Sequence, residues 1–230
     1  MPRQLVVLLL IAVAAQVLWA ATRGAPAATR IPLPAPPPVA VLRVFALGEP
    51  AVLARGLMLW LQSHDYQPGV SIPLRELDYR AIEAWLGTLL ELDPEFQYPL
   101  LLAARLYGEV NDRERQRQMI EFIARAYRVD PARRWPWLAH AVFLARHRLH
   151  DLPYALALAH ELNRSDDHGA IPHWAKQMEI FVLDDMGEVE AAKVLLGGLL
   201  ASGEIADAHE RAFLAQRLAQ LEQQAAASAR

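Results

Sequence analysis

The sequence contains no cysteine, so disulfide bonds, zinc thiolate sites and cysteine nucleophiles are excluded. It also lacks the Gly-x-Ser-x-Gly turn that presents a serine nucleophile, and it has no glycine-rich phosphate loop. The adjacent pair Gly197 and Gly198 lies inside an apolar helical pattern with no lysine after it. The enzyme and nucleotide-binding classes that depend on these motifs are therefore excluded.

Metal-binding histidine patterns are incomplete. The segments HELNR, from His160, and HERAF, from His209, begin like the zinc-protease motif. Arg164 and Phe213 stand where that motif needs its second histidine. Three other histidines share a predicted helical face with several arginines, which disfavour a divalent cation: His140, His147 and His150. We therefore expect no catalytic residue, no metal and no cofactor.

Hydrophobic residues make up 54% of the 230 residues, enough to bury a substantial core. The net charge of −3 is unevenly distributed. Residues 112–148 carry nine arginines against four acidic residues, whereas residues 161–222 carry twelve acidic against five basic residues. Opposite binding faces and oppositely charged solvated helices both give this pattern, and we favour the solvated helices. Because the domain is acidic overall, we expect no nucleic-acid partner.

The N-terminus is a membrane-directed segment. Arg3 precedes the apolar run Leu5–Ala21, which only Gln16 interrupts and which spans roughly 26 Å as a helix. The run length and Trp19 favour a retained transmembrane anchor, whereas the APA sequence at 25–27 favours a cleaved signal peptide. We favour the anchor, which would make the chain a single-pass protein of a bacterial inner membrane with its folded domain in the periplasm. Secretion to the periplasm after cleavage is the alternative.

Composition divides the chain into four segments. Residues 1–23 form the anchor or signal, and residues 24–41, with the sequence IPLPAPPPVA, form a proline-rich linker that helix and sheet interiors cannot accommodate. As polyproline II, this spacer would hold the domain up to roughly 50 Å from the bilayer. Residues 42–224 form the helical domain, and residues 225–230 form a disordered tail.

Apolar residues in the domain recur every three or four positions, and no segment alternates as a strand does. The fold class is therefore all-α. We expect helices at about 49–64, 78–92, 97–109, 113–128, 134–148, 152–164, 171–186, 188–202 and 204–224. Because their connections are short, neighbouring helices should pack antiparallel.

The helical pattern repeats. LELDP at 90–94 and YRVDP at 127–131 end similar segments, and a shift of 37 residues also places Trp137 on Trp174. The same shift brings Pro131 near the SDDHG turn at 165–169. A fixed period of this size is typical of stacked helical hairpins.

These segments resemble the tetratricopeptide repeat family. ELDP and RVDP match its acidic-proline ends, and MGEVEAAKVLL at 186–196 matches the start of its second helix, with Gly187 in the turn and Ala192 at the close helix contact. The resemblance covers roughly residues 78–203. It implies a right-handed stack of antiparallel hairpins, behind one N-terminal transmembrane or signal helix. The family period is 34 residues, so a related helical-hairpin solenoid and an irregular helical bundle remain alternatives.

In such stacks the first helix of each hairpin lines the concave face. By phase with the repeat, the resemblance places five residues there as candidate contacts for a protein partner: Tyr98, Arg105, Trp135, Arg146 and Glu179. Arginine and tryptophan are frequent energetic anchors at interfaces. We expect a non-catalytic scaffold that docks an extended peptide or helix in this groove, with no small-molecule substrate.

Two other functions stay open. An envelope enzyme or enzyme subunit would place a cleft among the histidines of residues 140–173. A lipid-binding domain would use the basic segment as a patch for anionic headgroups.

Overall fold

The computed structural model describes residues 3–22, 30–67, 70–164, 171–203, 205 and 207–228. These residues are almost entirely helical, which confirms the predicted all-α class. In the described part of the chain, regular sheet consists of β1 (Tyr66–Gln67) paired antiparallel with β2 (Val70–Ser71). The predicted SDDHG turn and the APA sequence lie outside the described residues.

The helices agree closely with the predicted segments. After the N-terminal helix α1 (Arg3–Thr22), they follow in this order: α2 (Val39–Phe45), α3 (Pro50–Ser63), the 3-10 turn η1 (Leu74–Glu76), α4 (Tyr79–Leu92), α5 (Tyr98–Leu102), η2 (Ala103–Tyr107), α6 (Arg113–Val129), α7 (Pro131–His147), α8 (Leu152–Arg164), α9 (His173–Lys176), α10 (Met178–Asp185), α11 (Val189–Ala201) and α12 (Ala208–Ser228). Sequence periodicity missed α2 and η1, which are short.

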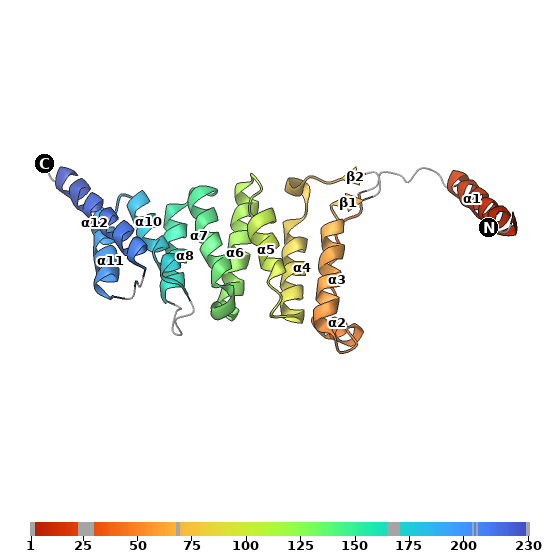
Figure 1. The fold of residues 1–230 in the computed structure, drawn as a ribbon, viewed down its shortest axis with the longest axis horizontal. Coiled ribbons are helices and arrows are strands. Elements are labelled where there is room, and N and C mark those ends of the chain that lie inside the picture. Colours follow the sequence, from red (N-terminus) through yellow and green to blue (C-terminus); the bar gives the residue numbers. More distant parts are fainter. Residues whose placement is uncertain are drawn as a thin grey trace.

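The helices from α2 to α12 form an elongated row in chain order, as Figure 1 shows. Each long helix packs mainly on its sequence neighbours, with α6 against α7, α7 against α8 and α10 against α11. One large apolar core runs from α2 to α10, and a second, smaller core joins α10, α11 and α12. Because most contacts are local, the larger core is drawn out along the row and consists of successive helix–helix interfaces.

Polar contacts between helices recur at nearly the spacing of the sequence repeat. Gln62 donates to the Tyr98 hydroxyl at 3.0 Å across 36 residues of chain. Trp137 Nε1 donates to Gln97 Oε1 at 2.7 Å across 40 residues. Arg128 forms a two-point ion pair with Glu161, 33 residues away. These contacts use part of the basic segment to hold helices to one another.

Aspartates fix the starts of three long helices. The side chain of Asp78 caps α4, that of Asp112 caps α6 and that of Asp130 caps α7, each accepting from backbone amides of the first turn. Pro131 follows Asp130 at the first helical position, where its missing amide hydrogen is not needed. The RVDP motif therefore ends α6 and starts α7.

One predicted helix, 97–109, changes its winding midway. After α5 the chain continues as the π-helical turn η2, and the Gly108 amide donates to the Ala103 carbonyl at 2.9 Å. A Cβ atom on Gly108 would lie 2.8 Å from both that carbonyl oxygen and Leu144 Cδ1 of α7. Glycine is therefore required where η2 and α7 approach each other.

The folded domain begins before the predicted boundary at residue 42. Residues 30–38, here called the strap, lie extended against the first helices instead of forming a free spacer. The Ile31 backbone exchanges two hydrogen bonds of 2.8 Å with the Gln67 side chain. Trp85 Nε1 donates to the Pro34 carbonyl at 2.7 Å. The correction has a physical cause, since the prolines exclude helix but leave their carbonyls free to accept hydrogen bonds.

The two ends of the chain also differ from the predicted boundaries. At the C-terminus, α12 continues to Ser228, so helix extends into the predicted tail at 225–230. At the N-terminus, α1 is apolar, and its large apolar side chains from Val6 to Trp19 are exposed. Among the described residues, no single helix has the length and apolarity of a membrane span, since Val6–Thr22 is too short. The pair α2 and α3 passes on length and composition, but a bend of 110° separates its halves.

Candidate interaction surface

The structure distributes the five predicted contact residues over α5, η2, α7 and α10. Tyr98 and Trp135 are half-buried, Tyr98 stacking on Phe96 and Trp135 meeting Trp174 edge to face at a centroid distance of 5.6 Å. Arg105 is exposed and projects from the π-helical turn η2, an irregularity that often marks functional positions.

The other two predicted residues have partners inside the chain. Arg146 of α7 makes a two-point ion pair with Asp185 of α10, and its guanidinium lowers the pKa of that carboxyl. Glu179 is buried and accepts hydrogen bonds from His160, at 3.0 Å, and from Asn163. Both side chains therefore hold helices of the row together, and their role as partner contacts stays a prediction.

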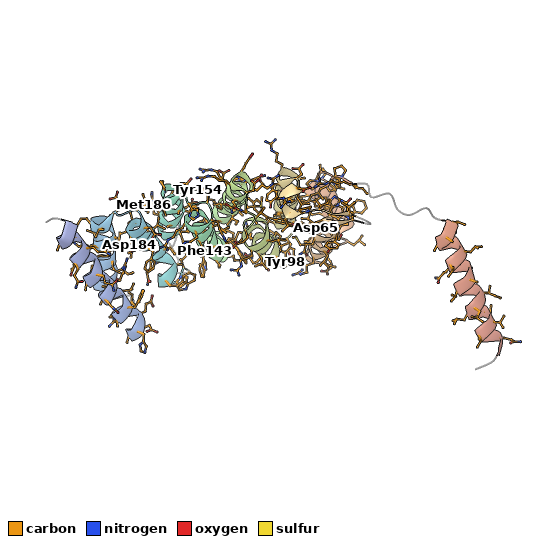
Figure 2. All side chains as sticks on the ribbon, turned by 90° about the horizontal axis from the view of Figure 1, so that it is seen from above. Asp65, Tyr98, Phe143, Tyr154, Asp184 and Met186 are labelled. Atoms are coloured by element: carbon orange, nitrogen blue, oxygen red, sulfur yellow. The ribbon has the colours of Figure 1, made fainter. Side chains whose placement is uncertain are left out.

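A larger open surface lies between α4 and α6. This α4–α6 groove has a volume of about 820 Å³. Small or apolar side chains form its floor: Ala84, Gly87, Thr88, Phe122, Ala126 and Val129. Its lining comes from α2, α4, the turn after α4, α6 and α7, and α5 does not contribute to it. Figure 2 shows the two layers, with Tyr98 and Phe143 toward one side of the row and Tyr154 toward the other.

The rim of the α4–α6 groove is basic. Four arginines and two glutamates are among the residues that line the groove: Arg43, Arg80, Arg125, Arg134, Glu83 and Glu91. Arg125 pairs with Glu83, whereas Arg80 is exposed and has no ion-pair partner among the described residues. The groove therefore presents an excess of positive charge on a chain with a net charge of −3.

Arg134 is the least ordinary of these arginines because it is only 3% exposed. Its terminal nitrogens donate to the carbonyls of Ala126, at 2.8 Å, and Pro94, at 3.3 Å. Its Nε has no acceptor among the described residues, and burial lowers the pKa of the guanidinium. The guanidinium is therefore held inside the protein by two carbonyls, with Asp130 as a nearby counter-charge.

Gly87 stands in the interior of α4, where glycine is less stable than alanine by roughly 0.5–1 kcal/mol. A Cβ atom there would lie 3.9 Å from Phe122, an ordinary contact. The packing of this chain therefore does not require glycine. Its absent side chain keeps the floor of the groove open.

Two histidines of the region predicted for the enzyme cleft, His140 and His160, lie in different surroundings. His140 is half-buried, and desolvation lowers its pKa, as does the charge of Arg105. His160 and Glu179 line a second groove, of about 740 Å³, between α8 and α11. In the described part of the chain, no three His, Cys, Asp or Glu side chains are placed to hold a metal ion.

The α4–α6 groove was not among the predicted sites, because the resemblance implies a binding surface on the first helix of each hairpin. The signals in the sequence were small residues at 84, 87 and 88, one helical turn apart, and an arginine-rich α6. No family model, no curated protein and no solved structure matches the chain. Its function is therefore inferred from its own residues.

Proposed function

We propose that the protein is a non-catalytic docking module, built as a tetratricopeptide-like array and held at a bacterial inner membrane by residues 5–21. The spacing of 33 to 40 residues between paired polar side chains of next-but-one helices, α3 with α5, α5 with α7 and α6 with α8, supports the repeat. The exposed apolar side chains of α1 support membrane attachment. The periplasmic placement of the row follows the sequence argument for the anchor.

The observation that carries the docking function is the α4–α6 groove. Its floor of small side chains admits close approach of another backbone, and its lining on α4 runs from Arg80 to Glu91. The occupant we propose is an amphipathic helix of a partner protein, lying along α4 and α6 with its apolar stripe on the floor. Acidic side chains of that helix would meet Arg80, which is exposed and has no ion-pair partner among the described residues.

The predicted residues Tyr98, Arg105 and Trp135 remain candidates for a second contact on the layer of first helices. Arg105 is the best placed of them because its side chain is exposed. A partner that reaches both layers would wrap around the row.

The docking proposal is tested by site-specific photocrosslinking in membranes. A photoreactive residue at Val129, which is exposed in the α4–α6 groove, should form one discrete adduct with another protein. The matched control is Val194, a valine of similar exposure in the α8–α11 groove. Equal adduct patterns at both positions would show that the α4–α6 groove is not a selective docking surface.

A further inference from the structure

The end of the row nearest the N-terminus exposes an apolar surface outside the α4–α6 groove, and Arg43 borders both. This surface, here called the α2–α3 tip, consists of Val44, Phe45, Leu47 and Val52, which are between 66% and 91% exposed. From 39 to 63 the chain carries only three charged residues: Arg43, Glu49 and Arg55.

Leu47 is the most exposed of these side chains and has an unfavourable backbone. Its φ is +50°, in the left-handed region that disfavours branched side chains, and Gly48 follows at +92°. Because 91% of Leu47 is exposed, packing within the chain does not offset the strain. Strained residues that the fold itself does not need often serve binding.

The opposite end of the row, formed by α12, exposes a more polar surface. Helical arrays need a polar outer surface on their terminal helices to stay soluble. At the α12 end, exposed polar residues are frequent: His209, Arg211, Gln216, Gln220 and Glu222. The α2–α3 tip has no comparable polar cover, so an external surface must meet it.

A lipid bilayer fits the tip better than a second copy of the chain. Together α2 and α3 have the length and composition of a membrane segment, but their 110° bend gives a wedge that lies at the bilayer surface. Arg43 donates to the Glu91 carbonyl at 3.2 Å and Arg55 lies 3.8 Å from Asp93, but the Arg55 side chain stays 58% exposed, which favours anionic headgroups. A two-fold contact between copies would instead bring these arginines together.

We infer that the α2–α3 tip is a lipid-contacting surface that enters the headgroup region of a bilayer containing anionic lipid. Phe45 and Leu47 supply the apolar contact, and Arg43 and Arg55 face the phosphates. The row is then held to the membrane at a second point besides α1, which fixes its orientation relative to the bilayer.

The absence of native cysteine permits a direct test. The full-length chain with Val44→Cys carries a polarity-sensitive fluorophore and is reconstituted in vesicles of phosphatidylcholine and phosphatidylglycerol. The matched control carries the same label at Ala212→Cys, an exposed position of α12. The label at 44 should shift to shorter wavelength and be quenched by nitroxide-labelled lipid, whereas the label at 212 should show neither effect.

A second variant separates lipid contact from folding. Phe45→Ser with Leu47→Gly removes the apolar contact and relieves the positive φ at 47, so the helical circular dichroism signal should remain while quenching at 44 is lost. Equal spectra at 44 and 212 would overturn the inference. A shift at 44 that lipid nitroxides do not quench, and that grows with the protein-to-lipid ratio, would assign the tip to a second copy and also overturn it.

Discussion

At the scale of single residues, the same amino acid has different uses according to its neighbours. Arg146 and Arg105 were both predicted as contacts, but Arg146 pairs with Asp185 while Arg105 is exposed. Sequence could predict that both lie on helices. It could not reveal the ion pair, because the partner lies 39 residues away and depends on how successive helices pack.

Charge reversal therefore separates the two arginines. Arg146→Glu should lower the free energy of unfolding by about 1–2 kcal/mol because it places a carboxylate against that of Asp185. Adding Asp185→Arg should recover most of this loss. Arg105→Glu should change that free energy by less than about 0.5 kcal/mol. Urea unfolding of the purified chain measures all three variants. Equal destabilisation by Arg105→Glu would contradict the assignment.

His140 predicts a pH dependence of stability. Burial, and then the charge of Arg105, lowers its pKa below the ordinary value of 6.5. The unfolded state therefore binds the proton more readily, so the stabilising contribution is complete above about pH 6.5 and is lost as the pH falls through the lower folded pKa. Through this group, the free energy of unfolding should change by no more than about 1.4 kcal/mol per pH unit. This pH dependence should be smaller in His140→Gln, in which His147, whose pKa burial also lowers, still contributes. An unchanged slope in this variant would assign the effect to other groups.

At the scale of elements, capping and periodicity made most helices predictable. Asp78, Asp112 and Asp130 mark helix starts, and the predicted segments agree with the long helices from α3 to α11. The strap was not predictable as a packed element because its hydrogen bonds to Gln67 and Trp85 are long-range. The π-helical turn η2 depends in the same way on its contact with α7.

Replacing glycine by alanine should destabilise the fold at Gly108 and stabilise it at Gly87. Gly108→Ala places a Cβ atom 2.8 Å from Leu144 and should destabilise the fold by about 1–3 kcal/mol. Gly87→Ala meets only an ordinary contact of 3.9 Å and should stabilise α4 by up to about 1 kcal/mol. Thermal unfolding followed by circular dichroism compares them. A stable Gly108→Ala protein would mean that η2 and α7 lie farther apart.

At the scale of the whole molecule, the all-α class and the order of the helices followed from the sequence, whereas the position of the main groove did not. The groove forms where small residues of α4 meet α6, a contact between helices that are not neighbours in the chain. Membrane attachment rests on the composition of residues 5–21. The mature protein should therefore remain in the membrane pellet after carbonate extraction, and recovery of a soluble form that begins near Ala28 would favour a cleaved signal.

The most direct test of the docking proposal introduces a large side chain at Gly87, on the floor of the groove. Gly87→Leu sends its side chain into the α4–α6 groove, whereas Gly87→Ala leaves the groove open. Both variants carry the photoreactive residue at Val129 and are crosslinked in membranes. We predict at least a tenfold lower adduct yield for Gly87→Leu, corresponding to about 1.4 kcal/mol of binding free energy, and an unchanged yield for Gly87→Ala. Equal yields from the two folded variants would contradict docking in this groove.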